Sequence, residues 1–246
     1  MPATRTGKSR EPYVLGVDGC RAGWAVTRLN LYDNACSGFV VGSFDQLFGD
    51  AQDAAMIIVD MPIGLADAGK RACETKAREL LRPHRHASVF SSPRRPMLDF
   101  DTYEDANAWG KAQGPGGGLS KQAWMITPKI REIDRTIMPA DQKRLGEGHP
   151  EVAFHRLNNG APCVHPKRTE DGQRERRKLL FAAGLTSADA LYETLRHEVG
   201  RKNIGRDDVF DACALALTAK ARLDGAAIRL TDGARDARGL VMEIWG

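Results

Sequence analysis

The stretch that decides the fold lies at residues 13–19 and reads Tyr-Val-Leu-Gly-Val-Asp-Gly. A run this apolar is typical of a strand that is buried on both faces of a sheet. Asp18 is the exception, because an ionised carboxylate among apolar side chains is costly unless a metal ion, a base or hydrogen-bond donors meet it. The stretch therefore predicts a buried strand with one carboxylate that needs a partner.

Two other apolar elements carry acidic residues at one end. Residues 56–60 read Met-Ile-Ile-Val-Asp and predict a second buried strand, which ends in Asp60. Residues 207–217 predict an apolar helix, and its first turns hold Asp207, Asp208 and Asp211. We interpret the three elements as the sources of one carboxylate cluster.

Several of these acids also have a structural interpretation. Asp18 could be a turn residue before Gly19, and Asp207 or Asp208 could cap the helix or interact with its dipole. Asp208 and Asp211 are three residues apart, which places them on one face of the helix. Both interpretations stay open on the sequence alone.

The intervening pattern predicts an antiparallel meander followed by parallel strands. Residues 24–31 alternate in polarity as a half-buried strand does, and residues 36–41 form a third short strand. A right-handed crossover would return residues 56–60 parallel to the first strand and beside it. Parallel neighbours lie ~4.8 Å apart, so Asp18 and Asp60 would meet at the edge where open α/β sheets bind ligands.

A long segment of helices and loops, residues 66–141, separates the fourth strand from the next strand near 143–148, and we interpret it as an insertion or lid. Pro128 is expected to break the helix predicted there. The other expected elements are helices over 187–199 and 207–223 and strands at 227–230 and 240–244. We expect one domain over residues 12–246 and a flexible tail at residues 1–11.

Composition sets the class of protein. With 246 residues, 42% of them hydrophobic, the chain can bury one sizeable core. No run approaches the ~18 apolar residues of a membrane span, and the first eleven residues lack the apolar segment of a signal peptide. We therefore expect a cytoplasmic protein without a membrane partner. The five cysteines, with no Cys-x-x-Cys, predict neither a disulfide framework nor a zinc site.

The acid cluster predicts a site for hard divalent cations. Mg²⁺ and Mn²⁺ take oxygen ligands, and two ions roughly 3.5–4 Å apart can clamp the attacking and leaving oxygens of a phosphodiester. The net charge of +4 permits a polyanionic partner without requiring one. The expected cofactor is two Mg or Mn ions, and the expected ligands are Asp18, Asp60, Asp208 and Asp211.

The order of these elements resembles the ribonuclease H-like nuclease fold, particularly its Holliday-junction resolvase branch. More closely, six motifs resemble domain-of-unknown-function family 429, whose members are described as predicted nucleases. The resemblance covers Tyr13 to Trp245. Its motifs are Gly16-Val17-Asp18-Gly19-Cys20-Arg21, Asp60-Met61-Pro62-Ile63-Gly64-Leu65, Ser88-Val89-Phe90, Pro128-Lys129-Ile130, His149-Pro150-Glu151 and Asp207-Asp208-Val209-Phe210-Asp211-Ala212.

The resemblance implies an α/β fold of the ribonuclease H-like type: a mixed five-stranded sheet flanked by helices, with the insertion after the fourth strand. It also implies a two-metal phosphodiesterase centre that hydrolyses nucleic acid, DNA or RNA. Its residues would be Asp18, Asp60 and Asp208 or Asp211, with Glu151 as a further candidate, although a Glu at a helix start is ordinary. A homodimer is compatible with the sequence.

Basic residues are the candidates for substrate binding. Lys167, Arg174 and Arg177 belong to a basic segment at a helix start, and Arg94 lies in a proline-rich loop. They would neutralise phosphates of the substrate. The alternative is a solvated helix face. His149, beside Glu151, could shuttle protons or form a helix-start hydrogen bond.

Two other functions fit parts of the pattern. A phosphotransferase of the actin and sugar-kinase type also has an Asp-Gly turn after its first strand, but the glycine run Gly116–Gly118 does not follow a predicted strand. A nucleic-acid-binding protein without turnover would keep the acids and the basic residues. Cation binding, ATP binding and nuclease assays separate the three.

Overall fold

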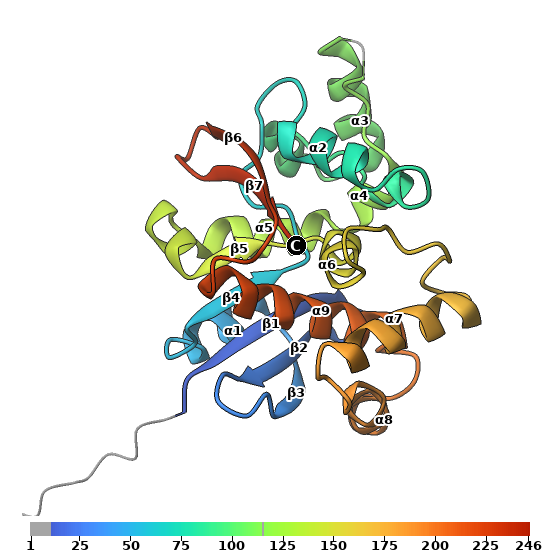
Figure 1. The fold of residues 1–246 in the computed structure, drawn as a ribbon. Coiled ribbons are helices and arrows are strands. Elements are labelled where there is room, and N and C mark those ends of the chain that lie inside the picture. The colour runs from blue at the N-terminus through green and yellow to red at the C-terminus, as the bar shows by residue number, and fades with distance from the viewer. Residues whose placement is uncertain (1–10, 115) are drawn as a thin grey trace, which may run out of the picture.

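The structure is a computed structural model that describes residues 11–114 and 116–246. The tail expected at residues 1–11 lies outside the described residues except for Glu11. A five-stranded sheet forms the centre (Figure 1). Its strands are β1 (Tyr13–Cys20), β2 (Gly23–Asn30), β3 (Cys36–Val41), β4 (Met56–Val59) and β5 (Leu145–Glu147).

The strand order in this sheet is β3-β2-β1-β4-β5. Strands β1, β2 and β3 pair antiparallel, whereas β4 pairs parallel with β1 and β5 pairs parallel with β4. The predicted meander followed by parallel strands is therefore confirmed. The C-terminal ends of β1, β4 and β5 lie at one edge of the sheet.

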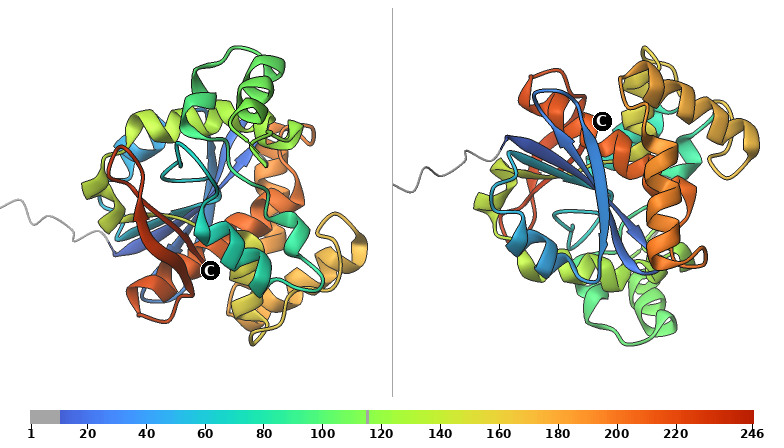
Figure 2. Two further views of the ribbon diagram at one scale, coloured as in Figure 1. Left: turned by 90° about the horizontal axis from the view of Figure 1, so that it is seen from above. Right: turned by 90° about the horizontal axis from the view of Figure 1, so that it is seen from below.

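Helices cover both faces of the sheet (Figure 2). On one face, α1 (Phe44–Asp50) and α5 (Thr127–Thr136) enclose an apolar core with Leu15, Trp24 and Ile57. The other face carries α6 (Pro150–Leu157), α7 (Glu170–Ala182), α8 (Ala188–Val199) and α9 (Arg206–Leu223). The central helix of this second layer is α9, which packs directly on β1, β2 and β4.

A glycine sets the distance between β1 and α9. A Cβ atom at Gly16 would lie 2.0 Å from the backbone oxygen of Ala212 and 2.2 Å from the backbone nitrogen of Ala216. Only glycine permits this approach. Because side chains in a strand alternate between faces, Asp18 points to the same side of the sheet as Gly16. The early turns of α9 are thereby held beside Asp18.

The segment between β4 and β5 is built from short helices: α2 (Ala72–Leu80), η1 (His86–Ser88), η2 (Arg95–Asp99), α3 (Tyr103–Ala112), α4 (Lys121–Met125), α5 and η3 (Pro139–Lys143). The predicted break at Pro128 is confirmed, since α5 begins at Thr127 with this proline in its first turn. Met97, Ala106 and Ala123 form a small core of the segment's own. Helix α5, in contrast, packs into the main core.

The last two strands form a separate antiparallel pair. They are β6 (Arg229–Arg235) and β7 (Val241–Trp245), close to the predicted positions. Both pack against α2, and the end of β7 bridges to Gly148 after β5. Among the described helices, none has the length and apolarity that a membrane crossing requires.

Candidate metal centre

Asp18 and Asp60 meet at the C-terminal edge of the two parallel strands. Val17 of β1 lies opposite Val59 of β4, and the backbone N–H of Asp60 donates to the carbonyl of Val17 at 2.9 Å. The two aspartates therefore lie on neighbouring strands at the same edge of the sheet, as the strand pattern predicts. This edge is where α/β sheets usually bind ligands.

Asp211 of α9 completes a group of three carboxylates, which we call the aspartate triad (Asp18, Asp60 and Asp211). Each residue offers a carboxylate oxygen, and these oxygens all lie within 4.8 Å of one another. Metal–oxygen bonds of roughly 2.0–2.6 Å place the ligands of one ion at most about 4–5 Å apart. The triad is thus compatible with a divalent cation.

Burial makes the triad electrostatically costly without a cation. Asp211 is fully buried and Asp18 is 6% exposed. Burial and then the charge of Asp60 raise the pKa of Asp18 well above its usual range. Burial likewise raises the pKa of Asp60 to about 7, against the attraction of Lys167. The Oδ1 atom of Asp211 is buried and has no hydrogen-bond partner among the described residues.

Lys167, which the sequence predicts to bind a substrate phosphate, lies beside the triad. Its Nζ is 2.5 Å from Oδ2 of Asp211 and 3.9 Å from Oδ2 of Asp207. Burial lowers the pKa of this ammonium group, but the charges of Asp211 and Asp18 outweigh burial and raise it. One third of the Lys167 side chain is exposed. The Lys167 side chain therefore contacts the triad and is in part accessible to solvent.

Asp208 caps α9, which is the structural role that the sequence left open for it. Its Oδ2 accepts a hydrogen bond from the N–H of Gly205 at 2.8 Å. Burial raises the pKa of Asp208 to about 6, and its charge also raises the pKa of Asp18. Asp208 is therefore close to the triad without belonging to it. Its role as a metal ligand stays a prediction.

Glu151 forms a buried ion pair at the start of α6. Its Oε1 lies 2.5 Å from Nη2 of Arg176, and both side chains are buried. Its Oε2 is buried and has no hydrogen-bond partner among the described residues. Burial raises the pKa of Glu151, and Arg176 opposes the rise. The catalytic role stays a prediction, and Arg176 gives this glutamate a structural one.

His149 caps the N-terminus of α6. Its Nδ1 accepts from the N–H of Glu151 at 3.2 Å. Burial lowers the pKa of His149 to about 4. The ring is thus neutral near pH 7, and the helix-start hydrogen bond expected of it is present.

The other predicted substrate-binding residues lie away from the triad. Arg174 pairs with Asp171 at 3.2 Å, and Arg177 pairs with Asp189 at 2.6 Å. Both lie on α7 with about half of their side chains exposed. Arg94 is buried beside Ser92 in a narrow recess of the segment between β4 and β5. Their roles in substrate binding stay predictions.

A cavity of about 300 Å³ opens beside the triad. Two triad residues, Asp60 and Asp211, line it together with Glu151 and Lys167. The lining residues that were not assigned a role from the sequence are Arg85, Ser88, Phe90, Gln122, Pro150, Pro166 and Arg168. The motifs Ser88-Val89-Phe90 and His149-Pro150-Glu151 were the sequence signals for this wall.

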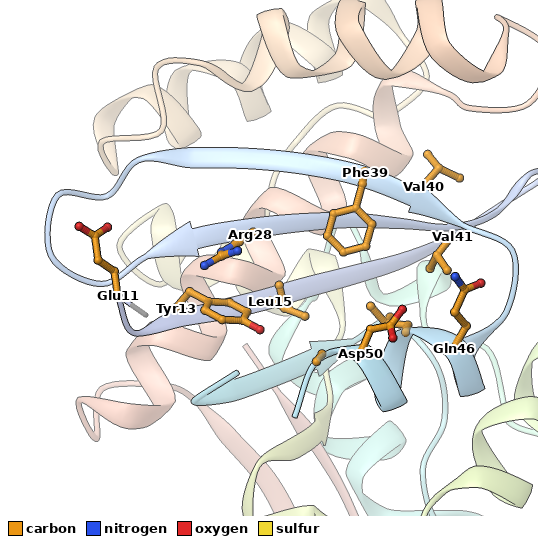
Figure 3. Close-up of a pocket in the computed structure, with 11 residues that line it drawn as sticks. Glu11, Tyr13, Leu15, Arg28, Phe39, Val40, Val41, Gln46 and Asp50 are labelled. Atoms are coloured by element: carbon orange, nitrogen blue, oxygen red, sulfur yellow. The ribbon is translucent and has the colours of Figure 1, made fainter. Parts of the chain in front are cut away.

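A larger cavity of about 640 Å³ lies between strands β1–β3 and α1, on the opposite face of the sheet (Figure 3). Tyr13, Arg28 and Phe39 line it, and the guanidinium of Arg28 lies 3.8 Å from the centre of the Tyr13 ring. None of the predicted site residues lines this cavity. We therefore place the candidate site at the triad.

The fold and the triad define an α/β protein with a buried acidic site that could hold a metal ion. Residues 16–235 match the family described as "Protein of unknown function (DUF429)". The chain belongs to this family, which confirms the resemblance seen in its motifs. No curated protein and no solved structure matches it.

Proposed function

We propose that this protein is a metal-dependent nuclease with a ribonuclease H-like fold, which hydrolyses phosphodiester bonds of nucleic acid with two Mg or Mn ions. The observation that carries the proposal is the aspartate triad. Three apolar elements that are distant in sequence each bring one carboxylate to the same sheet edge. Such a group is costly in the folded protein unless a cation compensates it.

The acidic residues and Lys167 would have separate roles in hydrolysis. Asp18, Asp60 and Asp211 would hold the cations, and Asp208 would contribute the oxygen that does not accept from Gly205 to the second one. Bound Mg²⁺ or Mn²⁺ would activate water and stabilise the charge on the phosphate. Lys167 would release Asp211 to the cation and donate to a phosphate oxygen.

The burial of the site supports this assignment. Asp18 is almost fully buried, and Asp211 is fully buried at the wall of the cavity. Electrostatic stabilisation of a phosphoryl centre is stronger in such a water-poor site than at an exposed surface.

The test compares cleavage of labelled DNA and RNA with Mg²⁺, Mn²⁺ or EDTA. We expect cleavage that requires the cation and that falls by more than about 100-fold in Asp18→Asn and Asp60→Asn. Melting temperatures show whether both variants fold. The matched control is Asp45→Asn, which makes the same change at an exposed position of α1, on the other face of the sheet.

The outcomes separate the proposal from its alternatives. Cleavage that persists in EDTA or in both folded variants would contradict it. Saturable ATP hydrolysis would instead indicate the phosphotransferase, although Gly116–Gly118 lies between α3 and α4 and follows no strand. Nucleic-acid binding without cation binding would indicate the alternative of a nucleic-acid-binding protein that catalyses no reaction.

A further inference from the structure

The cavity beside the triad is too small for double-stranded nucleic acid. Its volume is about 300 Å³, near the lower limit of small-molecule pockets at roughly 300 Å³. A duplex is much wider, since the major groove of B-DNA alone measures about 12 Å across. Asp60 and Asp211 line this cavity, so a phosphate that enters it with its nucleotide attached comes to the triad.

An aromatic ring forms part of the cavity wall. Phe90 lines the cavity and is partly buried, because it also packs against the small core that contains Met97, Ala106 and Ala123. Because one side of the Phe90 ring packs against this core, the ring is fixed in position and a base can stack on its other side. Aromatic side chains bind unpaired bases in this way, irrespective of base type.

A side-chain amide lies on the same wall. Gln122 belongs to α4, lines the cavity and is exposed, and no hydrogen bond joins its amide to another described residue. An amide offers both donors and an acceptor. It can therefore hydrogen-bond the polar edge of a base that no complementary strand occupies.

Two arginines also line the cavity. Arg85 donates to the carbonyl of Val164 at 3.3 Å but forms no ion pair with a carboxylate among the described residues, and its buried Nε has no partner there. Arg168 is 86% exposed and approaches only Asp207, at 3.4 Å. Both guanidinium groups remain available for phosphates on either side of a bound nucleotide.

We propose that this cavity takes one unpaired nucleotide next to the phosphate to be cleaved, with its base on Phe90, its polar edge at Gln122 and the flanking phosphates at Arg85 and Arg168. The substrate class is then single-stranded nucleic acid or an unpaired end. This inference rests on the proposed function, because it assigns the substrate of the same site. It also gives the segment between β4 and β5 a role in selecting that substrate.

The test measures binding, so that it does not depend on turnover. Fluorescence anisotropy with Ca²⁺ in place of Mg²⁺ compares a labelled 12-nucleotide single strand, as DNA and as RNA, with the blunt duplex of the same sequence. We expect the single strand to bind at least tenfold more tightly. Phe90→Leu, which keeps an apolar side chain without the aromatic face, should weaken single-strand binding about tenfold and leave duplex binding unchanged.

Two further variants complete the test. Gln122→Ala is exposed and should weaken single-strand binding severalfold, whereas Phe181→Ala, an exposed phenylalanine on α7, should change nothing. Equal binding of single strand and duplex, or unchanged binding in both Phe90→Leu and Gln122→Ala, would overturn the inference. Preference for DNA or for RNA identifies which single strand is the substrate.

The two proposals fail differently. Tight single-strand binding that depends on Phe90, without cleavage in Mg²⁺ or Mn²⁺, would contradict the proposed function and support this inference. Cation-dependent cleavage of continuous duplex that is unchanged in Phe90→Leu would support the proposed function and contradict this inference.

Discussion

Two buried groups of acidic residues lie at the same edge of the sheet, and they differ in how their charge is compensated. In the Arg71 cluster (Arg71, Glu74 and Glu147), one guanidinium bonds both carboxylates, and every member is at most 5% exposed. In the aspartate triad, Lys167 is the one described residue that forms an ion pair, and it does so with Asp211 alone. Asp18 and Asp211 are also buried and Asp60 is partly exposed, yet the charge of the triad is compensated less.

The difference separates a structural network from a candidate binding site. Burial lowers the pKa of Arg71, but the charges of Glu147 and Glu74 outweigh it and raise that pKa. Glu147 also accepts from the N–H of Ile63 at 2.7 Å, which fixes the loop after Asp60. Burial still raises the pKa of Glu147 to about 7 against the attraction of Arg71, and the triad carboxylates also raise each other's pKa values with less positive charge beside them. Their uncompensated charge is what a cation would use.

The largest expected effect is the loss of the shared guanidinium. Arg71→Met leaves two buried carboxylates without their partner, so the free energy of unfolding should fall by about 3–5 kcal/mol. Urea denaturation at pH 8 measures it. Arg174→Met is the control, because its pairs are exposed and should contribute less than about 1 kcal/mol. If the free energy of unfolding of Arg71→Met fell by less than about 1 kcal/mol, Arg71 would not be the residue that compensates its two carboxylates, and the contrast with the triad would be wrong.

Removing one charge from the triad should act in the opposite direction. Asp18→Asn relieves repulsion within the triad, so the metal-free protein should gain about 0.5–2 kcal/mol, as substitutions at strained functional sites often do. The same variant should lose most of the stabilisation that Mn²⁺ gives the natural protein. Thermal unfolding with and without Mn²⁺ shows both. A less stable Asp18→Asn protein would indicate that the carboxylate is structural.

The pH dependence gives a smaller effect whose sign follows from the raised pKa of Asp60. This pKa is about 7 in the folded protein against an ordinary 3.8, so the folded state holds the proton more tightly than the unfolded state. Stability of the metal-free protein therefore falls as pH rises through about 7. The fall between pH 6 and 8 should be about 1 kcal/mol.

Asp60→Asn checks this origin, because its stability should vary less with pH than that of the natural protein. Stabilisation by Mn²⁺ should grow over the same range, since the ion competes with the proton for the carboxylate. An unchanged pH profile in Asp60→Asn would assign the dependence to other groups.

The sequence predicted the part of the site that depends on strand order. Apolar strands that end in Asp18 and Asp60 were enough to place both acids at one edge, because parallel pairing leaves few arrangements. The sheet and the break at Pro128 followed from the same local rules. The close contact of α9 with β1 at Gly16 then brought Asp211 to that edge.

The rest of the site depends on long-range contacts that leave no local pattern. Spacing put Asp208 and Asp211 on one helix face, but the cap at Gly205 decides which of them joins the triad. Lys167 belonged to a run of basic residues like Arg174 and Arg177, and only the fold distinguishes it from them. The pairing of Glu151 on α6 with Arg176 on α7 joins residues that are 25 positions apart and was not visible in the sequence.

The most direct test of the account is a crystal structure of the protein soaked in Mn²⁺, with anomalous scattering measured to locate the ion. The account predicts at least one peak between the carboxylates of Asp18, Asp60 and Asp211, with the ammonium group of Lys167 displaced from Asp211. A map without a peak there, with Lys167 still bonded to Asp211 at saturating Mn²⁺, would contradict it.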